Sequence, residues 1–479
     1  MIVGIDIGTE GLRAVTFDEQ NLKFIEFKEN YKVYFPAPEQ AIQKPEEIFS
    51  ALKKILKNFS GMDTKVYIGF SSVFHSILAL DDEFKPVTDS IIWADRRAVG
   101  EKEFLEQKYG SRFFYERTGC PLHAMYWPAK ILWIKKRTQN VVKFSSIKSY
   151  LIYRITGKLV EELSLASGTG IFNIHRQNWD KEILEILGSN EKELPEIVSP
   201  YEVIKAKSDF SRELGFDEIY IIPGAGDGVL ANFGVGAIDS KTAVVTVGTS
   251  GAVRLFFDKP ILDNEGTATW CYLFDEKNYV LGSAINNGGI VLMWLRETMK
   301  FDSYEEIIDV AMKSPVGAKG LVFLPYLNGE RCPNWVEKYK GVIVGLTSLH
   351  SRNDIARSTL EGIGFRVKDM LESIKRVSGT APEKIIATGG FTNSKEWIQI
   401  VSNILGEKLE ITNTTNQSAI GAYLIAMKAL NLGWKRFLDE NIKVETVVNP
   451  SKEDFELYED VYKRYRYLYD LLLNYWKEF

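Results

Sequence analysis

The sequence predicts an α/β protein built from two similar domains, and three observations support this. The chain has 479 residues, which is too long for one ordinary domain and fits two of about 200 to 250 residues. Short apolar strands alternate with helical periods along the chain. A strand–glycine–strand pattern found near the start also returns half a chain later.

The opening stretch GIDIGTEGLRAVTFD, residues 4–18, is typical of a hairpin of two strands. Asp6 lies inside the first strand, two residues before Gly8, and Thr9 follows that glycine. An edge-strand aspartate beside a tight turn is the ordinary structural explanation, so this stretch alone does not indicate a site.

The stretch VVTVGTSGAVRLFF, residues 244–257, repeats the same design. The aligned pairs are Gly8 with Gly248, Thr9 with Thr249 and Asp6 with Thr246. One hairpin therefore opens each half of the chain, and we expect domains over residues 1–238 and 239–479 that face each other. A matched pair of Gly-Thr loops favours one ligand held from both sides over a duplicated structural turn.

The chemistry of these loops suits a nucleotide polyphosphate. Glycine lets backbone N–H groups approach phosphate oxygens, and a threonine hydroxyl adds a donor. Asp6 would repel phosphate directly, but it could hold a Mg²⁺ ion that bridges to the phosphates through water. The chain contains no Walker A sequence and no G-x-G-x-x-G that opens its first helix, so a P-loop and a dinucleotide fold are disfavoured.

Asp227 is the candidate catalytic residue of the stretch IIPGAGDGVLANFGVGA, residues 221–237. Its position at a predicted helix start also fits a simple helix cap. The neighbouring glycines 224, 226 and 228 clear space around a carboxylate, which a cap does not require. A carboxylate just before the second Gly-Thr loop suits a general base for a hydroxyl that attacks the γ-phosphorus.

The second half also contains a candidate nucleoside site. KIIATGGFTNSKEWIQIVSNILG, residues 384–406, predicts a strand, a Gly389-Gly390 turn and a helix that begins near Ser394. AINNGGIVLMWLRE, residues 284–297, brings a second glycine pair, which includes Gly289, to a helix N-terminus. Glycines let a base and a ribose lie against the backbone.

Composition excludes several other classes of protein. The net charge of −5 and the pI near 5.7 argue against a nucleic-acid partner, and no apolar run reaches the length of a membrane span. No signal peptide is visible, and three widely spaced cysteines fit a reducing cytoplasm and form no metal motif. We expect a cytoplasmic protein with a small-molecule substrate.

Taken together, these segments resemble the FGGY carbohydrate kinases of the actin-like ATPase superfold, over nearly the whole chain. GIDIGT is similar to their first phosphate motif, VTVGTSGAV to their second, ATGGFTNSKEW to their adenosine motif and PGAGDGVLANFG to the segment with their catalytic aspartate. Within the family, GFSSVFHSILALD, PVTDSIIWADRRA, SLASGTGIFNI and FLPYLNGERCPNW are most similar to gluconate kinases. The resemblance implies two actin-like (ribonuclease H-like) domains with a nucleotide cleft between them.

The resemblance also implies roles for individual residues. Asp227 would be the base, and Asp6 together with Asp227 would hold Mg²⁺. Residues at the ATP would be Thr9, Arg13, Gly248, Thr249, Gly289, Gly389, Gly390 and Ser394. Residues at the substrate would be Phe74, His75, Trp93, Asp95, Arg96, Met125 and Asp227. His75 and Trp93 also fit ordinary core positions, and residues 95–97 fit a solvated helix start.

The implied reaction is transfer of the γ-phosphoryl group of ATP to the terminal hydroxyl of D-gluconate, which gives 6-phosphogluconate. A gluconate site needs a cation, and Arg96, Arg97 and Lys130 are the candidates. Glu10-Gly11-Leu12 departs from the usual Thr-Ser-Thr-like run, which removes hydroxyl donors and adds a negative charge near phosphate. A kinase of xylulose or another ketose or polyol is the alternative, followed by an actin-like ATPase without a sugar. The oligomeric state is left open, with a homodimer as one alternative.

Overall fold

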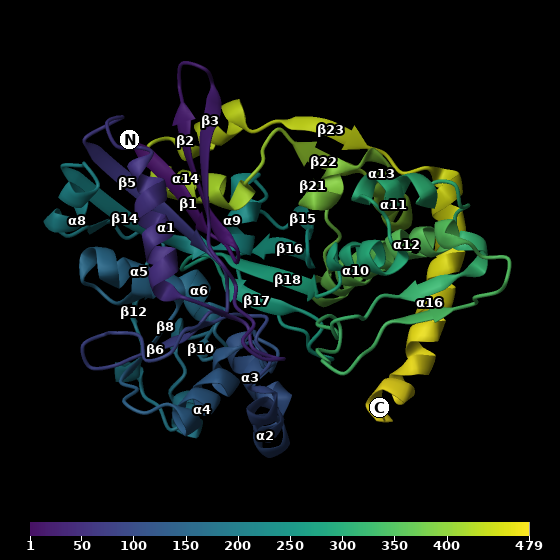
Figure 1. The fold of residues 1–479 in the computed structure, drawn as a ribbon, viewed down its shortest axis with the longest axis horizontal. Helices are drawn as coiled ribbons and strands as arrows, with labels where there is room; N and C mark the ends of the chain where they lie inside the picture. The colour runs from purple at the N-terminus through teal and green to yellow at the C-terminus, as the bar shows by residue number, and fades with distance from the viewer. Residues whose placement is uncertain (479) are drawn as a thin grey trace.

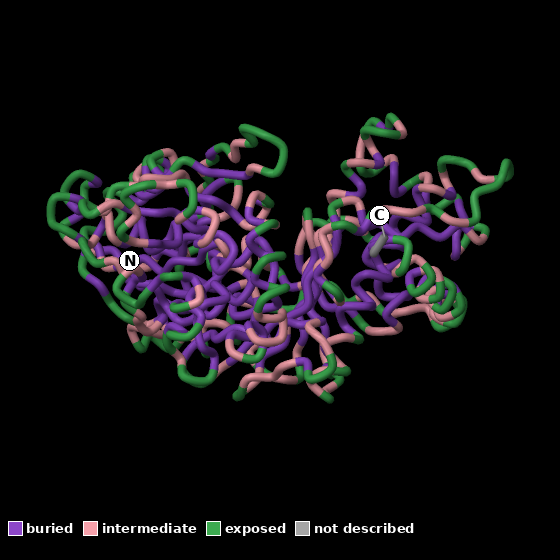
Figure 2. The backbone as a smooth tube through the Cα atoms, turned by 90° about the horizontal axis from the view of Figure 1, so that it is seen from below, coloured by how far each residue is buried: buried purple, intermediate pink, exposed green. Residues whose placement is uncertain are grey.

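Two mixed β-sheets form the centres of the two halves of the molecule (Figure 1). The structure is a computed structural model that describes residues 1–478. Buried segments gather inside both halves, and exposed chain covers the outside (Figure 2). Within the described residues no helix is long and apolar enough to cross a membrane.

The first sheet has the strand order β13-β14-β5-β1-β2-β3. Its strands are β1 (Ile2–Ile7), β2 (Gly11–Asp18), β3 (Lys23–Asn30), β5 (Lys65–Ser72), β13 (Ile204–Lys205) and β14 (Glu218–Gly226). β1 pairs antiparallel with β2 and parallel with β5, while β5 pairs parallel with β14. The centre of the sheet is therefore parallel, and the predicted opening hairpin is β1–β2.

The second sheet has the order β17-β18-β16-β15-β21-β22-β23. Its strands are β15 (Thr242–Val247), β16 (Gly251–Phe257), β17 (Trp270–Leu273), β18 (Tyr279–Ile285), β21 (Lys384–Thr388), β22 (Leu409–Thr412) and β23 (Val444–Val448). β15 pairs antiparallel with β16 and parallel with β21, as β1 does with β2 and β5. The repeated topology confirms the predicted fold class of two similar α/β units.

Helices and short strand pairs surround the two sheets. The helices of the first half are α1 (Pro45–Lys57), α2 (Val99–Tyr109), α3 (Ser111–Thr118), α4 (Trp127–Arg137), α5 (Ile147–Thr156), α6 (Leu163–Ser167), α7 (Lys181–Ile186), α8 (Ser208–Glu213) and α9 (Asp227–Gly234). Those of the second half are α10 (Ile290–Met299), α11 (Tyr304–Ala311), α12 (Arg352–Ser378), α13 (Lys395–Leu405), α14 (Gln417–Ala429), α15 (Trp434–Asn441) and α16 (Lys452–Glu478). The short pairs are β4 (Ile42–Gln43) with β7 (Ser90–Ile91), β6 (Leu78–Leu80) with β8 (Lys143–Ser145), β9 (Val160–Glu162) with β12 (Glu196–Val198), β10 (Phe172–Asn173) with β11 (Asn178–Trp179), and β19 (Val322–Leu324) with β20 (Val342–Val344).

Sequence signals define the long helix α12 at both ends. Ser351 and Asp354 form a reciprocal capping box at its start, and Gly379 ends it in the left-handed conformation with φ 66°. Most of its length is buried, because α11, α13 and the second sheet pack around it.

Helix α14 comes from the second half of the sequence but packs on β1 and β5 of the first sheet (Figure 1). Two glycines permit this close approach. A Cβ atom on Gly4 would lie 2.1 Å from the carbonyl oxygen of Ala419, and one on Gly69 would lie 2.0 Å from that of Ala422. The strands of the two large sheets fall on either side of residue 238. Helix α14 packs across that division, so the predicted domain boundary at residue 238 stays a proposal.

Candidate active site

A cavity of about 860 Å³ lies between the two hairpins and is lined by residues of both halves. The first hairpin contributes its Gly-Thr turn, the second contributes residues 248–252, and Asp227 and Gly228 at the start of α9 also line the cavity. Both Gly-Thr loops therefore line one cavity, although they lie far apart in the sequence. This is the arrangement that the repeated motif predicts.

The predicted site residues divide into two groups by their position relative to this cavity. Those that line it are Thr9, Arg13, Phe74, His75, Trp93, Met125, Asp227, Gly248 and Thr249. Within the described part of the chain, those outside the lining are Asp6, Asp95, Arg96, Gly289, Gly389, Gly390 and Ser394. The roles of both groups of residues stay predictions.

Asp227 is the first residue of α9, and Gly226 occupies the N-cap position. Its carboxylate accepts a hydrogen bond of 2.6 Å from the backbone N–H of Gly228. Burial, and after it the charge of Asp6, raises the pKa of Asp227 to about 7, although Arg254 and the Gly228 N–H act in the opposite direction. A carboxylate with this pKa can take up a proton near neutral pH.

The glycines around Asp227 make room for other groups rather than for the carboxylate itself. A Cβ atom on Gly226 would lie 2.0 Å from the Phe74 ring, and one on Gly228 would lie 2.7 Å from Nε of Arg254. The glycine-rich turn therefore lets an aromatic ring and a guanidinium approach either side of the start of α9.

Asp6 is buried and lies outside the lining of the cavity. Its carboxylate accepts a 2.6 Å hydrogen bond from Ser71 Oγ, and Nη1 of Arg13 is 3.8 Å away. Burial raises its pKa, while Ser71 and Arg13 lower it. The corresponding position in the second hairpin has Thr246, whose hydroxyl lies 2.8 Å from that of Thr388.

The donor set fits a hydrated Mg²⁺ ion. Asp6 and Asp227 are two carboxylates with raised pKa, and the charge of Asp6 raises the pKa of Asp227. A cation would relieve this repulsion, and Mg²⁺ is commonly held by one or two carboxylates together with substrate phosphates. No cluster of three His, Cys, Asp or Glu side chains suited to a metal occurs in the described residues.

The predicted sugar side contains a pair of neighbouring rings, Phe74 and the half-buried His75. Phe74 and His75 have ring centroids 5.5 Å apart, and Nδ1 of His75 lies 2.8 Å from the Gly168 carbonyl oxygen. Burial lowers the pKa of His75 well below its ordinary value, so this side chain is neutral. The indole N–H of Trp93 donates to the Thr9 hydroxyl at 3.4 Å.

The three cations proposed from the sequence have other surroundings. Arg96 is exposed outside the lining, and Arg97 pairs with the buried Asp95 at 2.9 Å. Lys130 is buried and donates to the carbonyl oxygens of His75 and Ile92 at 2.8 and 2.9 Å. Asp95 also accepts from the Ala41 N–H at 2.8 Å, so its carboxylate already has several partners.

The predicted nucleoside segment borders the second hairpin. The N–H of Gly289 donates to the Gly248 carbonyl at 2.6 Å, and a Cβ on Gly389 would lie 2.6 Å from the Val247 carbonyl oxygen. Gly390 is exposed, and Ser394 Oγ caps α13 by accepting from the Trp397 N–H at 3.1 Å. Gly289 and Gly389 therefore lie beside the second Gly-Thr loop, and the nucleoside site stays a prediction.

Sequence reasoning missed two arginines that line the cavity, Arg254 and Arg331. Arg254 lies on β16, donates to Thr246 Oγ1 at 3.2 Å and lowers the pKa of Asp227. An arginine inside the apolar run GAVRLFF was the available signal for it. Arg331 lies in the segment FLPYLNGERCPNW, where it is a charged residue among aromatic and proline residues.

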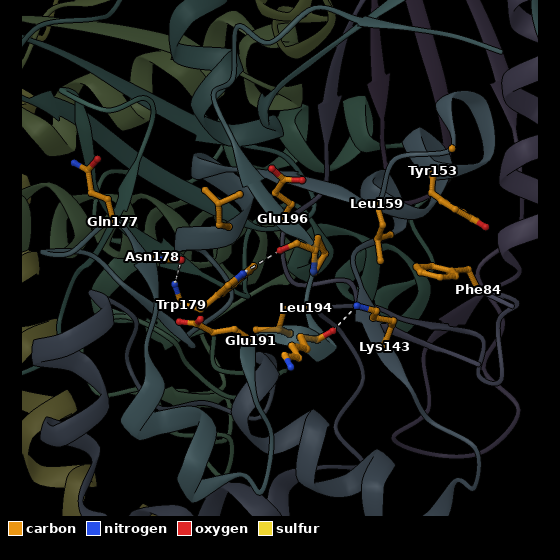
Figure 3. A pocket seen from close by; sticks show the side chains of 14 residues that line it. Phe84, Lys143, Tyr153, Leu159, Gln177, Asn178, Trp179, Glu191, Leu194 and Glu196 are labelled. Atoms are coloured by element: carbon orange, nitrogen blue, oxygen red, sulfur yellow. Dashed lines mark hydrogen bonds between the residues drawn. The ribbon is translucent and has the colours of Figure 1, made fainter. Parts of the chain in front are cut away.

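A second hollow, of about 940 Å³, lies in the first half beside β12 and α5 (Figure 3). Phe84 stacks on Tyr153 there, and Trp179 donates its indole N–H to the Pro195 carbonyl at 3.0 Å. None of the predicted site residues lines this hollow in the described structure. The positions of the predicted site residues therefore favour the smaller cavity, between the hairpins, as the active site.

Comparisons with known proteins give matches along the whole chain. The model for the N-terminal domain of the FGGY family of carbohydrate kinases matches residues 1–234, and that for its C-terminal domain matches residues 243–430. A gluconokinase of Bacillus subtilis (strain 168) is 32% identical over 99% of this chain and 95% of its own. A crystal structure of gluconate kinase from Lactobacillus acidophilus has a TM-score of 0.92 at 33% identity, covering 98% of both chains. A ligand-bound xylulose kinase structure from the same organism has a TM-score of 0.93 at 33% identity, covering 100% of this chain and 99% of its own.

Proposed function

The chain belongs to the FGGY family of carbohydrate kinases, and from this premise we propose that it transfers the γ-phosphoryl group of ATP to the terminal hydroxyl of D-gluconate. The observation that carries the proposal is Asp227, a carboxylate with a pKa raised to about 7 on the wall of a cavity between two Gly-Thr loops. Kinases of this family use ATP as their phosphate donor.

The residues around the cavity have distinct tasks in this reaction. Thr9 and Thr249 bind the polyphosphate from opposite sides, and Asp227 accepts the proton of the attacking hydroxyl. Phe74 and Trp93 orient the carbon chain of the substrate and exclude water. Asp6 and Asp227 are the residues that would hold Mg²⁺, which neutralises charge on the phosphates when bound.

Gluconate is the preferred substrate in this proposal because a gluconokinase relative covers nearly the whole chain at 32% identity. The xylulose kinase neighbour, at 33% identity, makes D-xylulose the competitor. Both substrates end in a primary hydroxyl, so the phosphoryl-transfer end does not separate them. We also propose a cytoplasmic location, which fits a chain whose three cysteines are buried and free.

ADP release measured with a panel of acceptors tests the proposal. The panel contains D-gluconate, D-xylulose, glycerol and a control without sugar, each with ATP and Mg²⁺. We expect kcat/KM for D-gluconate to exceed that for D-xylulose by at least about tenfold. A preference for D-xylulose or glycerol would reject gluconate as the substrate, and ADP release independent of any acceptor would indicate an ATPase.

A further inference from the structure

Arg331 presents a cationic side chain to the cavity without an acidic partner. It lies between β19 and β20, and its guanidinium donates through Nη2 to the carbonyl oxygen of Ile285 at 2.6 Å. Its Nε is buried and has no hydrogen-bond partner. Among the described residues, no ion pair includes Arg331. A guanidinium with a buried, unpartnered nitrogen is stabilised by an anion, which the protein itself does not supply here.

The other cations of the cavity are already engaged or lie at its rim. Arg13 faces Asp6, and Arg254 lies beside Asp227 and donates to Thr246. Lys28 and Lys32 are exposed. Within the described part of the chain, the half-buried Arg331 is therefore the cation of this cavity that has a buried nitrogen without a hydrogen-bond partner and capacity left for a ligand.

The position of Arg331 is at the predicted sugar side of the cavity. Its charge contributes, after burial and Lys130, to the lowered pKa of His75. It also contributes, after burial, to the lowered pKa of His123, which Glu337 acts to raise. The rings of His75 and Tyr126 are 4.8 Å apart, and the hydroxyls of Tyr126 and Tyr272 are 2.6 Å apart. Arg331 thus shares the lining of the cavity with Phe74, His75 and Tyr272.

The chain holds Arg331 firmly from both sides. Glu330 forms an ion pair with the buried Arg366 and accepts from the Tyr469 hydroxyl at 3.2 Å, which anchors it to α12 and α16. The N–H of Cys332 donates to the Ala284 carbonyl at 2.9 Å on β18. A side chain whose neighbours are fixed in this way loses little freedom when it binds a ligand.

We propose that Arg331 binds the carboxylate of the sugar-acid substrate and selects it over neutral sugars. This inference rests on the proposed function, because it requires a carboxylate at the end of the substrate opposite to the phosphorylated hydroxyl. An arginine fork matches the two oxygens of a carboxylate. A neutral substrate of the same length leaves the guanidinium unpaired, and the enzyme discriminates against it for that reason.

The experiment compares D-gluconate with D-gluconamide, which replaces only the carboxylate by a neutral amide. Wild type, Arg331→Met and Arg331→Lys are assayed for kcat and KM with each acceptor and for the KM of ATP. Arg436→Met is the matched control, because Arg436 is exposed on α15 and pairs with Glu440. Thermal unfolding of every variant, with and without ATP, checks that the variants fold.

We expect wild type to prefer gluconate to gluconamide by at least about tenfold in kcat/KM. Arg331→Met should remove this preference by raising the KM for gluconate, with little change for gluconamide or ATP, and Arg331→Lys should keep part of it. Equal losses for both acceptors would overturn the inference. A raised KM for ATP instead would assign Arg331 to a nucleotide phosphate.

The test also separates this inference from the proposed function. If the wild type does not phosphorylate gluconate, the proposed function is wrong, whatever the variants do. If the wild type prefers gluconate and Arg331→Met keeps that preference, only the role of Arg331 is wrong. Arg96→Met is assayed in parallel, because loss of the preference in that variant alone would show that Arg96, and not Arg331, binds the carboxylate.

Discussion

The indole N–H of Trp93 donates a hydrogen bond to the hydroxyl oxygen of Thr9 at 3.4 Å, and both side chains line the same cavity. A residue predicted to contact the substrate is thereby connected to a residue predicted to contact phosphate. The corresponding Thr249 of the second hairpin has no such bond to an indole among the described residues. The two threonines are therefore equivalent by sequence repeat but not by surroundings.

This difference predicts distinct effects of Thr9→Val and Thr249→Val. Each should weaken nucleotide binding by about 1 kcal/mol, because one hydrogen bond is lost. Only Thr9→Val should also raise the KM for the sugar, since it leaves the Trp93 N–H without its partner. Calorimetric titration with a non-hydrolysable ATP analogue and steady-state kinetics measure the two effects.

The double variant completes the cycle. If both loops hold one polyphosphate, the losses of Thr9→Val and Thr249→Val should couple rather than add. Strictly additive losses, or unchanged nucleotide binding in Thr9→Val, would mean that the first hairpin is only structural. Glu10, which is exposed on the cavity wall, gives that outcome a physical reason, because its charge repels phosphate.

Asp227→Asn should lower kcat by about 10²- to 10⁴-fold, because the amide has the shape of the carboxylate but cannot accept the proton of the hydroxyl. Nucleotide affinity without metal should change little. Pre-steady-state measurement of phosphoryl transfer checks the chemical step itself. Turnover close to wild type would reduce Asp227 to a residue that only begins α9.

The paired hairpins could be predicted from the sequence because their signals are local. A Gly-Thr turn between two alternating apolar strands is visible within about fifteen residues. The topology repeats as expected, and even the pairing of Asp6 with Ser71 has its counterpart in Thr246 and Thr388. Local pattern and tertiary structure agree wherever the hairpin itself determines the contacts.

The cations of the site could not be assigned in this way, because their surroundings depend on contacts distant in sequence. Arg97 is occupied by Asp95, whereas Arg331 reaches the cavity from a segment far from Asp227 in the chain. The close packing of α14 on the first sheet is similar, since it depends on Gly4 and Gly69 meeting the backbone of a distant helix. Contacts of this kind leave no pattern in the local sequence.

Lys148→Met should destabilise the fold by about 3 to 5 kcal/mol, the cost of leaving a buried charge unpaired. Lys148 and Glu162 form an ion pair of 2.6 Å with both side chains fully buried, and Lys148 also donates to the Pro223 carbonyl at 2.9 Å. Urea unfolding gives the free energy of unfolding and checks the size of the loss.

Lys241→Met is the control for this experiment, because the Lys241–Glu383 pair of 2.7 Å is exposed and should contribute less than about 1 kcal/mol. Adding Glu162→Gln to Lys148→Met should recover part of the loss, since the double variant buries no charge at this pair. Equal losses for Lys148→Met and Lys241→Met would contradict the assignment of a buried pair.

The pH profile of kcat/KM should have an acid limb that reports Asp227. Burial, and after it the charge of Asp6, raises the pKa of Asp227 to about 7. A base acts only when deprotonated, so kcat/KM should fall about tenfold for each pH unit below that value. Steady-state assays between about pH 5 and 9 measure the limb, and Asp227→Asn should abolish it.

The same shift has a consequence for stability. The pKa of Asp227 is higher in the folded protein than the ordinary carboxyl value of 3.8, so the folded state binds the proton more tightly. The stability that this protonation contributes is fully present below about pH 4 and is lost as the pH rises through about 7. The Tm of Asp227→Asn relative to wild type should therefore increase over this interval.

Asp6→Asn tests the cause of the shift, because it removes one of the two contributions that raise the pKa of Asp227. The acid limb should move to lower pH, but not to the ordinary carboxyl value, since burial persists. Asp209→Asn is the control, because that side chain is 92% exposed and its substitution should leave the pH profile unchanged.

An acid limb that stays in place in Asp6→Asn would mean that Asp6 does not act on Asp227 through its charge. A limb that moves to higher pH would contradict the sign of the interaction, since removal of a negative charge favours ionisation of a neighbouring carboxyl group.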